Sequence, residues 1–171
     1  MESLGIYVHI PFCKRKCKYC DFLSAPSNEE LREKYVESLC RKIRLYQDLA
    51  KAYHVVSIFL GGGTPSILES GKTKQIFQAL RETFKIDPNA EITTELNPGT
   101  VTEEKLKVYK EIGINRLSIG LQSIHDNELK KLGRIHSYQD FLNTFEMVKA
   151  MGINNINVDL MYGIPDQTKE S

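Results

Sequence analysis

The sequence predicts an α/β protein: a run of βα units whose parallel sheet is open at one edge. Short apolar runs alternate with amphipathic helical patterns along the chain, which is typical of such units. The tripeptide Gly-Ile-Asn occurs at 113–115 and again at 152–154, each time between a helical pattern and an apolar run. At 171 residues the chain is too short for a closed barrel of eight units, which takes about 250 residues.

Five apolar runs are the expected strands, and they span residues 6–10, 55–60, 92–96, 117–121 and 156–161. The first helix is expected to begin near Ser27, with Glu30 completing a capping box. Its inner face is predicted at four helically spaced residues, namely Leu31, Tyr35, Leu39 and Ile43. The inner face of the second helix is predicted at Ile76, Phe77, Leu80 and Phe84.

The two following helices carry clear start and stop signals. The third is expected to begin at Thr102 and to end at Gly113, because threonine is a good N-cap residue and glycine commonly ends helices. Its inward residues would be Leu106, Tyr109 and Ile112. The fourth is expected to begin at Ser137, paired with Asp140, and to end at Gly152.

Residues 167–170 look like the opening of a further helix after the fifth strand. A parallel sheet is normally covered on both faces and does not end on a bare edge strand. We therefore expect residues 1–171 to form one domain that is the N-terminal part of a longer protein, with the sheet truncated after about five strands.

Polar residues alternate with apolar ones in the third, fourth and fifth strands. Glu95, Gln122 and Asp159 lie near the ends of these strands, on the face opposite the apolar positions. Since helices cover the apolar face, the polar face would line the concave side, and unpaired polar groups buried there would be costly. We expect an open, wet groove that holds a polar ligand; internal hydrogen bonding among these side chains is the alternative.

The charge and hydropathy of the chain give no sign of a nucleic-acid or membrane partner, and the expected compartment is a reducing one. The net charge of +1 gives no reason to expect nucleic acid or an anionic membrane as a partner. No apolar run approaches the roughly 20 residues needed to span a bilayer, and the N-terminus lacks a secretory-signal layout. We therefore expect a cytoplasmic protein, in which closely spaced cysteines indicate a metal site rather than disulfides.

Cys13, Cys17 and Cys20 follow the first strand with the spacing C-x3-C-x2-C. Three thiolates can hold three irons of a [4Fe–4S] cluster and leave the fourth open. The open iron could chelate the amino and carboxylate groups of S-adenosylmethionine (SAM), whose reductive cleavage gives a 5′-deoxyadenosyl radical. A zinc site is the alternative, with His9 as its only nearby fourth ligand. Cys40 occupies a helical position and is expected to be a core thiol.

Further candidates follow the second and fourth strands. Gly61-Gly62-Gly63-Thr64-Pro65 fits neither the dinucleotide fingerprint nor the P-loop, but its bare backbone could approach a bound methionine moiety. Arg134 is interpreted either as a partner of a carboxylate or as a surface residue. His9 could line the groove or be a hydrogen-bonded core residue, and the other three histidines are expected to be solvated: His54, His125 and His136.

Together these segments resemble the radical SAM family of oxygen-independent coproporphyrinogen III dehydrogenase and its heme-chaperone relatives (HemW). The resemblance begins at Tyr7-Val8-His9-Ile10-Pro11-Phe12-Cys13 and includes the cysteine loop, the glycine run, Leu121-Gln122-Ser123 and the segment 159–165. It implies a partial radical SAM barrel of about six βα units, a [4Fe–4S] cluster on the three cysteines, and a C-terminal domain beyond this chain. It also implies contacts to SAM from Tyr7, Tyr19, Gly62, Gly63, Thr64, Glu95, Gln122, Arg134 and Asp159, some of them to a second SAM in the dehydrogenase.

Two features separate the branches of this family. The dehydrogenase resembles this chain but carries a further cysteine two residues past the cluster loop, where this chain has Phe22. It also has a long N-terminal extension before the first strand, whereas this chain enters that strand almost at once. Both features favour the heme-chaperone branch, with heme or a porphyrin, a heme-acceptor protein and an electron donor as the implied partners. The dehydrogenase is the alternative, so an enzymatic role stays open.

Overall fold

A computed structural model of the chain describes residues 1–169. Its elements follow in this order: β1 (Glu2–Ile10), β2 (Phe12–Cys13), β3 (Ala25–Pro26), α1 (Glu29–Arg44), α2 (Gln47–Ala50), β4 (Tyr53–Gly62), a 3-10 turn η1 (Pro65–Ile67), α3 (Ser70–Thr83), β5 (Ile86–Leu96), α4 (Glu103–Glu111), β6 (Arg116–Gln122), α5 (Asp126–Leu132), α6 (Tyr138–Ala150) and β7 (Asn155–Leu160). All five predicted strands are present, most of them longer at their amino ends than expected.

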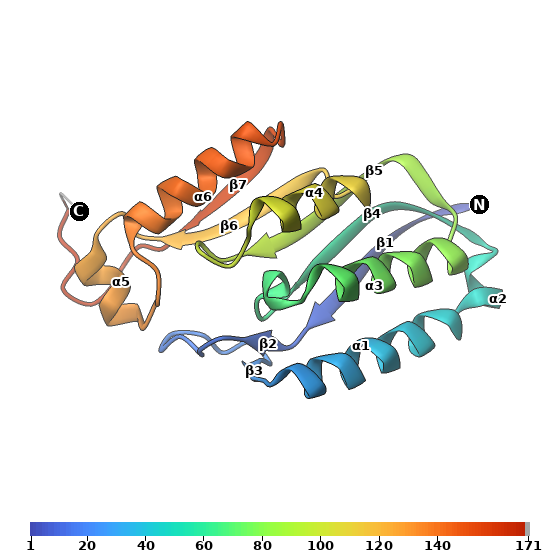
Figure 1. The fold of residues 1–171 in the computed structure, drawn as a ribbon, viewed down its shortest axis with the longest axis horizontal. Helices are drawn as coiled ribbons and strands as arrows, with labels where there is room; N and C mark the ends of the chain where they lie inside the picture. The colour runs from blue at the N-terminus through green and yellow to red at the C-terminus, as the bar shows by residue number, and fades with distance from the viewer. Residues whose placement is uncertain (170–171) are drawn as a thin grey trace.

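The five long strands form one parallel sheet in the order β1-β4-β5-β6-β7, which is also their order along the chain. Each crossover therefore steps in the same direction, and crossovers of one hand place their helices on one face. Figure 1 shows α1, α3, α4 and α6 along the same side of the sheet. Within residues 1–169 no pairing joins β1 to β7, so the prediction of an open parallel α/β sheet is confirmed.

The core lies between the sheet and these helices. Strand positions of one parity are buried against the helices, as in Val8 and Ile10 of β1 and Leu117 and Ile119 of β6, each no more than 3% exposed. The predicted inner face of α4 is confirmed, because Leu106, Tyr109 and Ile112 are all buried. The alternate strand residues point to the other face of the sheet, away from the helices, where they can line a site.

The helix caps agree with the sequence in two cases and differ in one. Thr102 caps α4, and Ser137 forms a capping box with Asp140 at the start of α6, as predicted. At α1 the predicted Ser27–Glu30 box is wrong: the side chain of Asn28 accepts from the N–H of Leu31 instead. The helix therefore starts one residue later than a Ser27 cap would place it.

Three of the four residues predicted for the inner face of α1 are confirmed, because Ile43 is buried and Tyr35 and Leu39 pack half-buried against the core. Leu31 is exposed and that part of the prediction is wrong, while Val36 and Cys40 are buried as well. The expectation that Cys40 is a core thiol is confirmed, and burial raises its pKa. A helix at 167–170 is not formed over residues 167–169, and Glu170 lies outside the described residues.

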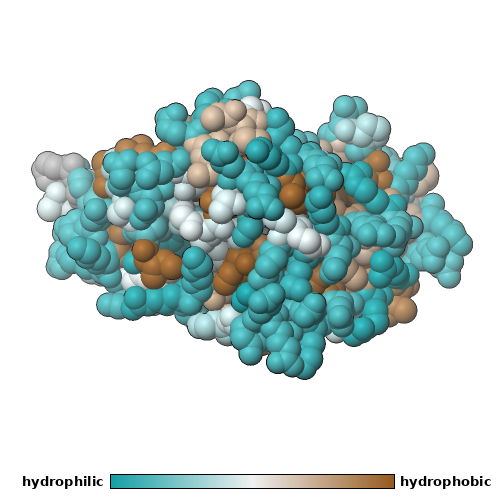
Figure 2. Space-filling view, viewed as in Figure 1, coloured by the Kyte–Doolittle hydropathy of each residue, from teal (hydrophilic) through white to brown (hydrophobic). Residues whose placement is uncertain are grey.

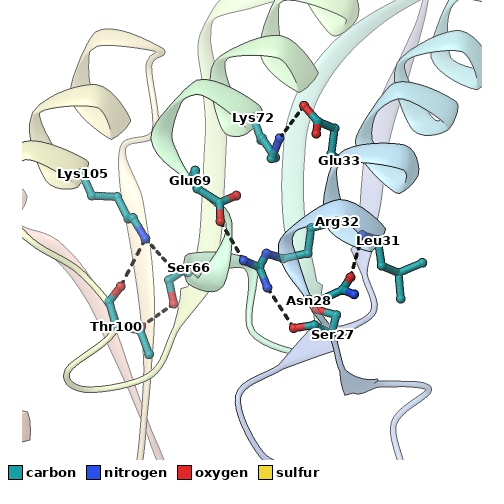
Figure 3. A network of polar contacts seen from close by, with 10 residues as sticks. All are labelled: Ser27, Asn28, Leu31, Arg32, Glu33, Ser66, Glu69, Lys72, Thr100 and Lys105. Carbon is teal, nitrogen blue, oxygen red and sulfur yellow. Dashed lines mark hydrogen bonds and ion pairs between the residues drawn. The ribbon is translucent and has the colours of Figure 1, made fainter.

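A network of polar contacts joins α1, the start of α3 and the start of α4 (Figure 3). Arg32 donates to the carbonyl of Ser27 and pairs with Glu69 at 2.8 Å. Lys105 donates to the carbonyls of Ser66 and Thr100, and burial lowers its pKa. The network holds the turn that follows the glycine run against two helices.

The helix-covered face of the molecule is mostly hydrophilic, with apolar residues showing in small areas (Figure 2). No helix formed by residues 1–169 is both long enough and apolar enough to cross a bilayer.

Candidate functional site

One pocket opens where β4, β5, β6 and β7 reach their carboxyl ends, the edge at which the sequence predicted a ligand. Its walls come from the cysteine loop, the turn after β4 and the last residues of β5, β6 and β7. It brings together the three predicted cluster ligands and eight predicted SAM contacts: Tyr19, Gly62, Gly63, Thr64, Glu95, Gln122, Arg134 and Asp159. Tyr7 does not line it. The binding roles of all these residues stay predictions.

The cysteine loop is held at both ends by backbone hydrogen bonds. Phe12–Cys13 pairs with Ala25–Pro26 as a short two-stranded ribbon, which closes the loop on itself. The N–H of Lys18 donates to the carbonyl of Leu132 at 2.9 Å, so the middle of the loop is fastened to the end of α5. The structure thus fixes the loop by contacts far away in the sequence.

The three cysteines differ in burial but line the same pocket. Cys13 is buried, while Cys17 and Cys20 are half-buried, and all three are free thiols. No group of three His, Cys, Asp or Glu side chains within the described part of the chain converges on a point where one ion could bind.

The glycine run lets the chain turn tightly against β1. Gly62 has φ +112°, and a Cβ there would lie 2.5 Å from the His9 ring. At Gly63 a Cβ would lie 2.5 Å from the carbonyl oxygen of Phe12. Gly63 donates to the carbonyl of Ile10 at 2.8 Å, and Thr64 donates to that of Phe12 at 2.7 Å. Only glycine allows this close backbone approach, which places Thr64 beside the cysteine loop.

Two carboxylates enter the pocket from β5 and β7. Glu95 accepts the backbone N–H of Gly62 at 3.0 Å, and its pKa is raised chiefly by burial and further by the nearby charge of Asp159. Asp159 accepts from the Asn157 side chain at 2.7 Å and from Ser118 Oγ at 3.2 Å. The predicted polar groove is confirmed, and part of its polarity is satisfied internally.

The comparison with protein families decides the assignment of this fold. The model of the radical SAM superfamily matches residues 7–171, which is nearly the whole chain. The chain belongs to the radical SAM superfamily.

Curated relatives in the radical SAM superfamily include heme chaperones. The chain is 40% identical over 171 residues to the heme chaperone HemW of Escherichia coli (strain K12), covering 99% of this chain and 45% of that protein. It is 37% identical over 165 residues to HemW of Bacillus subtilis (strain 168), covering 95% of this chain and 43% of that protein. The chain thus spans less than half the length of these relatives.

Among solved structures, the chain is similar to the radical SAM enzyme coproporphyrinogen III oxidase (HemN) from Escherichia coli. The TM-score is 0.91 at 29% identity, covering 99% of this chain and 39% of that one. The predicted family and the partial-barrel fold are therefore confirmed. Membership implies SAM and a [4Fe–4S] cluster as cofactors, and the donor set of the pocket fits them: three thiols, a bare glycine turn and polar strand ends.

Arg134 is half-buried and bonded to protein groups, so its interpretation as a surface residue is wrong, while its pairing with a carboxylate of a bound ligand stays a prediction. Its guanidinium donates to Asn97 Oδ1 at 2.7 Å and to the carbonyl of Gly120, and it approaches Cys17 Sγ at 3.7 Å. It also donates to Tyr19 at 3.5 Å. Arg134 therefore bridges two strand ends and the cysteine loop.

The two tyrosines predicted to contact SAM lie in different surroundings. Tyr19 lines the pocket, and its pKa rises to about 12, mainly through burial, although the Arg134 charge opposes the rise. Tyr7 is 59% exposed, stacks on Phe59 and shares a hydrogen bond with His9 at 2.9 Å. A contact between Tyr7 and SAM stays a prediction.

The histidines only partly follow their predictions. His9 bonds to Tyr7 and to the carbonyl of Leu23 at 2.9 Å, which satisfies its ring and agrees with the hydrogen-bonded reading. His136 was expected to be solvated, and this is wrong: it is buried, it lies 3.3 Å from the carbonyl of Leu121, and its pKa falls to about 4, mainly through burial.

Three further residues line the pocket: Asn97, Ser118 and Gly120. The sequence placed them on the polar face of their strands but gave them no role. Helix α5, whose end holds Lys18, was not predicted because its seven residues include only two that are apolar and buried, Leu129 and Leu132.

Proposed function

We propose that Cys13, Cys17 and Cys20 hold a [4Fe–4S] cluster whose fourth iron is left for SAM. The observation that carries this is the single pocket in which these three thiols meet the glycine turn and the polar strand ends. When bound, the cluster supplies the electron that cleaves SAM reductively.

The chain's own residues would orient SAM. Gly62 and Gly63 line the pocket, and their N–H groups are already bonded to Glu95 and to the carbonyl of Ile10. Their carbonyl oxygens would therefore be the backbone groups that accept from the amino group of the methionine moiety. Glu95, Gln122 and Asp159 offer acceptors for polar hydrogens on the cofactor. Gln122 has φ +76° at the bulge that ends β6, a strained conformation that aims a side chain and is typical of functional sites.

Within this family we propose that the chain is the core of a heme chaperone, which binds heme and delivers it to acceptor proteins. The proposal is supported by 40% identity to the Escherichia coli chaperone along nearly the whole chain. It is also supported by Phe22, a pocket residue at the place where the dehydrogenase resemblance calls for a cysteine. An electron donor and a heme-acceptor protein would be partners, and the cytoplasm the compartment.

Coproporphyrinogen III oxidative decarboxylation is the second candidate function. The specific observation in its favour is the TM-score of 0.91 against the Escherichia coli oxidase. The two functions share the cluster and the fold, so coproporphyrinogen turnover on one side and heme binding and transfer on the other distinguish them.

The deciding experiment uses anaerobically reconstituted protein with SAM and a reductant. One arm adds coproporphyrinogen III and measures protoporphyrinogen IX, with the Escherichia coli oxidase as the positive control. The other arm titrates heme and follows its absorption band, then adds an apo heme protein and follows transfer. Both arms are repeated with the full-length Escherichia coli chaperone, because this chain spans 45% of it.

The chaperone proposal predicts heme binding and transfer without protoporphyrinogen formation. Turnover of coproporphyrinogen at a rate comparable with the oxidase would reject it in favour of the second function. Heme binding by the full-length relative but not by this chain would place the heme determinants outside residues 1–171.

A further inference from the structure

A continuous hydrogen-bond chain links two of the three proposed cluster ligands through Thr64 after β4, Asn97 after β5 and Arg134 after α5. Thr64 Oγ1 donates to Cys13 Sγ at 3.5 Å, and Asn97 Nδ2 donates to Thr64 Oγ1 at 2.9 Å. On the other side of the amide, Arg134 donates to Asn97 Oδ1 at 2.7 Å and to Cys17 Sγ at 3.7 Å. Asn97 is the central link of this chain.

The direction of every bond in the chain follows from one fact. A guanidinium only donates, so the amide of Asn97 must turn its oxygen toward Arg134 and its nitrogen toward Thr64. The Thr64 oxygen then accepts, which leaves its own hydrogen free to point at Cys13. Both ends of the chain therefore donate toward a sulfur atom.

We propose that Asn97 is a positioning residue for the cluster: it orients Thr64 and Arg134 so that both donate to cluster thiolates. The inference rests on the proposed cluster at Cys13 and Cys17. It gives a role to a residue that neither the sequence motifs nor the predicted SAM contacts include.

The residues around Asn97 leave room for its bond with Arg134 and hold its backbone. A Cβ at position 120 would lie 3.0 Å from Asn97 Oδ1 and 3.2 Å from Arg134 Nη2, so glycine there leaves room for the pair. The backbone of Asn97 is fixed as well, since its carbonyl accepts from the N–H of Thr100 at 3.1 Å and also from the Thr100 hydroxyl. The amide thus has little freedom to turn.

The expected consequence is electrostatic. Hydrogen bonds to cluster sulfurs stabilise the more negative, reduced state and so raise the reduction potential. Without Asn97, Thr64 can turn its hydrogen elsewhere and Arg134 loses its anchor. We expect the ratio of reduced to oxidised cluster at a fixed ambient potential to fall roughly tenfold, which corresponds to a potential about 59 mV more negative for a one-electron couple.

The test measures iron and sulfide content and the cluster potential by EPR-monitored redox titration, without SAM. Asn97→Leu removes both bonds of the amide. Asn97→Asp keeps the bond from Arg134 but presents an acceptor to Thr64, which draws the Thr64 hydrogen away from Cys13. Thr64→Ser keeps the hydroxyl and is the conservative rescue. Thr73→Val is the matched control, because the Thr73 hydroxyl is buried in α3 and has no hydrogen-bond partner within residues 1–169.

Both Asn97 variants should show the lower potential, while Thr64→Ser and Thr73→Val should match the unchanged protein. Loss of the cluster from both Asn97 variants but not from Thr73→Val would also support the positioning role. A fully loaded cluster with unchanged potential in either Asn97 variant overturns the proposal. If the unchanged protein itself assembles no cluster, the proposed function fails together with this inference; a normal cluster in it with unaltered variants rejects this inference alone.

Discussion

The backbone N–H of Gly62 donates to Glu95 Oε2 at 3.0 Å, and this bond joins the glycine turn after β4 to the end of β5. Burial raises the pKa of Glu95, and the charge of Asp159 adds to the rise, while the Gly62 bond opposes it. The folded state therefore binds a proton at Glu95 more readily than the unfolded state does. The charged form of Glu95 therefore lowers the free energy of unfolding at neutral pH.

Glu95→Gln is expected to separate stability from cofactor binding. Because the folded pKa is raised, the charged carboxylate reduces stability as pH rises above its unfolded pKa, so the neutral glutamine should leave Tm at pH 7 equal or higher. Its oxygen can still accept from Gly62. Affinity for SAM should fall about tenfold or more, since a charged acceptor is lost from the pocket. Calorimetry of SAM binding and thermal melts check both parts.

Glu91→Gln is the matched control for that substitution, since Glu91 lies on the same strand but is exposed. It should change neither Tm nor SAM affinity appreciably. A Glu95→Gln protein that binds SAM as tightly as the unchanged one would remove Glu95 from the predicted contacts.

The Arg32–Glu69 pair is expected to stabilise the fold in a pH-dependent way. Burial alone would raise the pKa of Glu69, but the hydrogen bond and charge of Arg32 outweigh it and lower that pKa. A lowered folded pKa contributes stability above the unfolded pKa that is lost as pH falls through the folded one. The Glu69 side chain is 41% exposed, so solvent screens part of the interaction. Glu69→Gln should therefore destabilise the protein at pH 7 by no more than about 1 kcal/mol and converge with the unchanged protein in acid.

Glu69→Gln is expected to lose stability because it leaves the Arg32 charge without its partner. The Arg32 side chain is only 13% exposed, and its Nε already has no partner within residues 1–169. Glu30→Gln provides the comparison, since the Glu30–Lys34 pair is about 70% exposed on both sides and should be worth no more than about 0.5 kcal/mol. Urea unfolding of the three proteins between pH 7 and pH 3 measures the difference. Parallel pH profiles for Glu69→Gln and the unchanged protein would contradict the assignment.

Much of the fold follows from local signals that the sequence displays. The alternation in β6 and the caps at Thr102 and Ser137 depend on neighbouring residues, so they are readable along the chain. The cap of α1 lies at Asn28 and not at the predicted Ser27. Both are good N-cap residues, and only the final backbone conformation decides between them.

The site is less predictable where its contacts are long-range. Residue type and motif resemblance identified the cysteines and Arg134, but the bond of Arg134 to Asn97 spans 37 residues. The support of Lys18 by Leu132 depends on a backbone carbonyl, which has no residue-type signature. Such contacts arise from how βα units stack, which local patterns do not encode.

Single cysteine substitutions are expected to divide the four cysteines into three ligands and one core residue. Changing Cys13, Cys17 or Cys20 to alanine should abolish the iron–sulfur EPR signal, because two remaining thiolates cannot hold the cubane firmly. Cys40→Ala should keep the signal while costing about 1 kcal/mol of stability for the small cavity it leaves in the core. Iron and sulfide analysis after anaerobic reconstitution measures the first effect. Retention of a full cluster in all three loop variants would show that Cys13, Cys17 and Cys20 are not its ligands.

Gly63→Ala is expected to damage the cluster loop through the backbone alone. The added Cβ would lie 2.5 Å from the carbonyl oxygen and 2.8 Å from the nitrogen of Phe12, and neither atom can move without breaking the bond from Thr64 to Phe12. We expect about 2–3 kcal/mol of destabilisation and a marked loss of cluster occupancy. Gly71→Ala is the control, because a Cβ at Gly71 meets nothing within 4 Å. Alanine also favours the helical conformation of α3, so the free energy of unfolding should rise by about 0.5–1 kcal/mol. Urea unfolding and iron content measured on the two variants test the pair. If Gly63→Ala kept both its stability and its iron, the close packing of the glycine turn on Phe12 would not be what holds the loop in place.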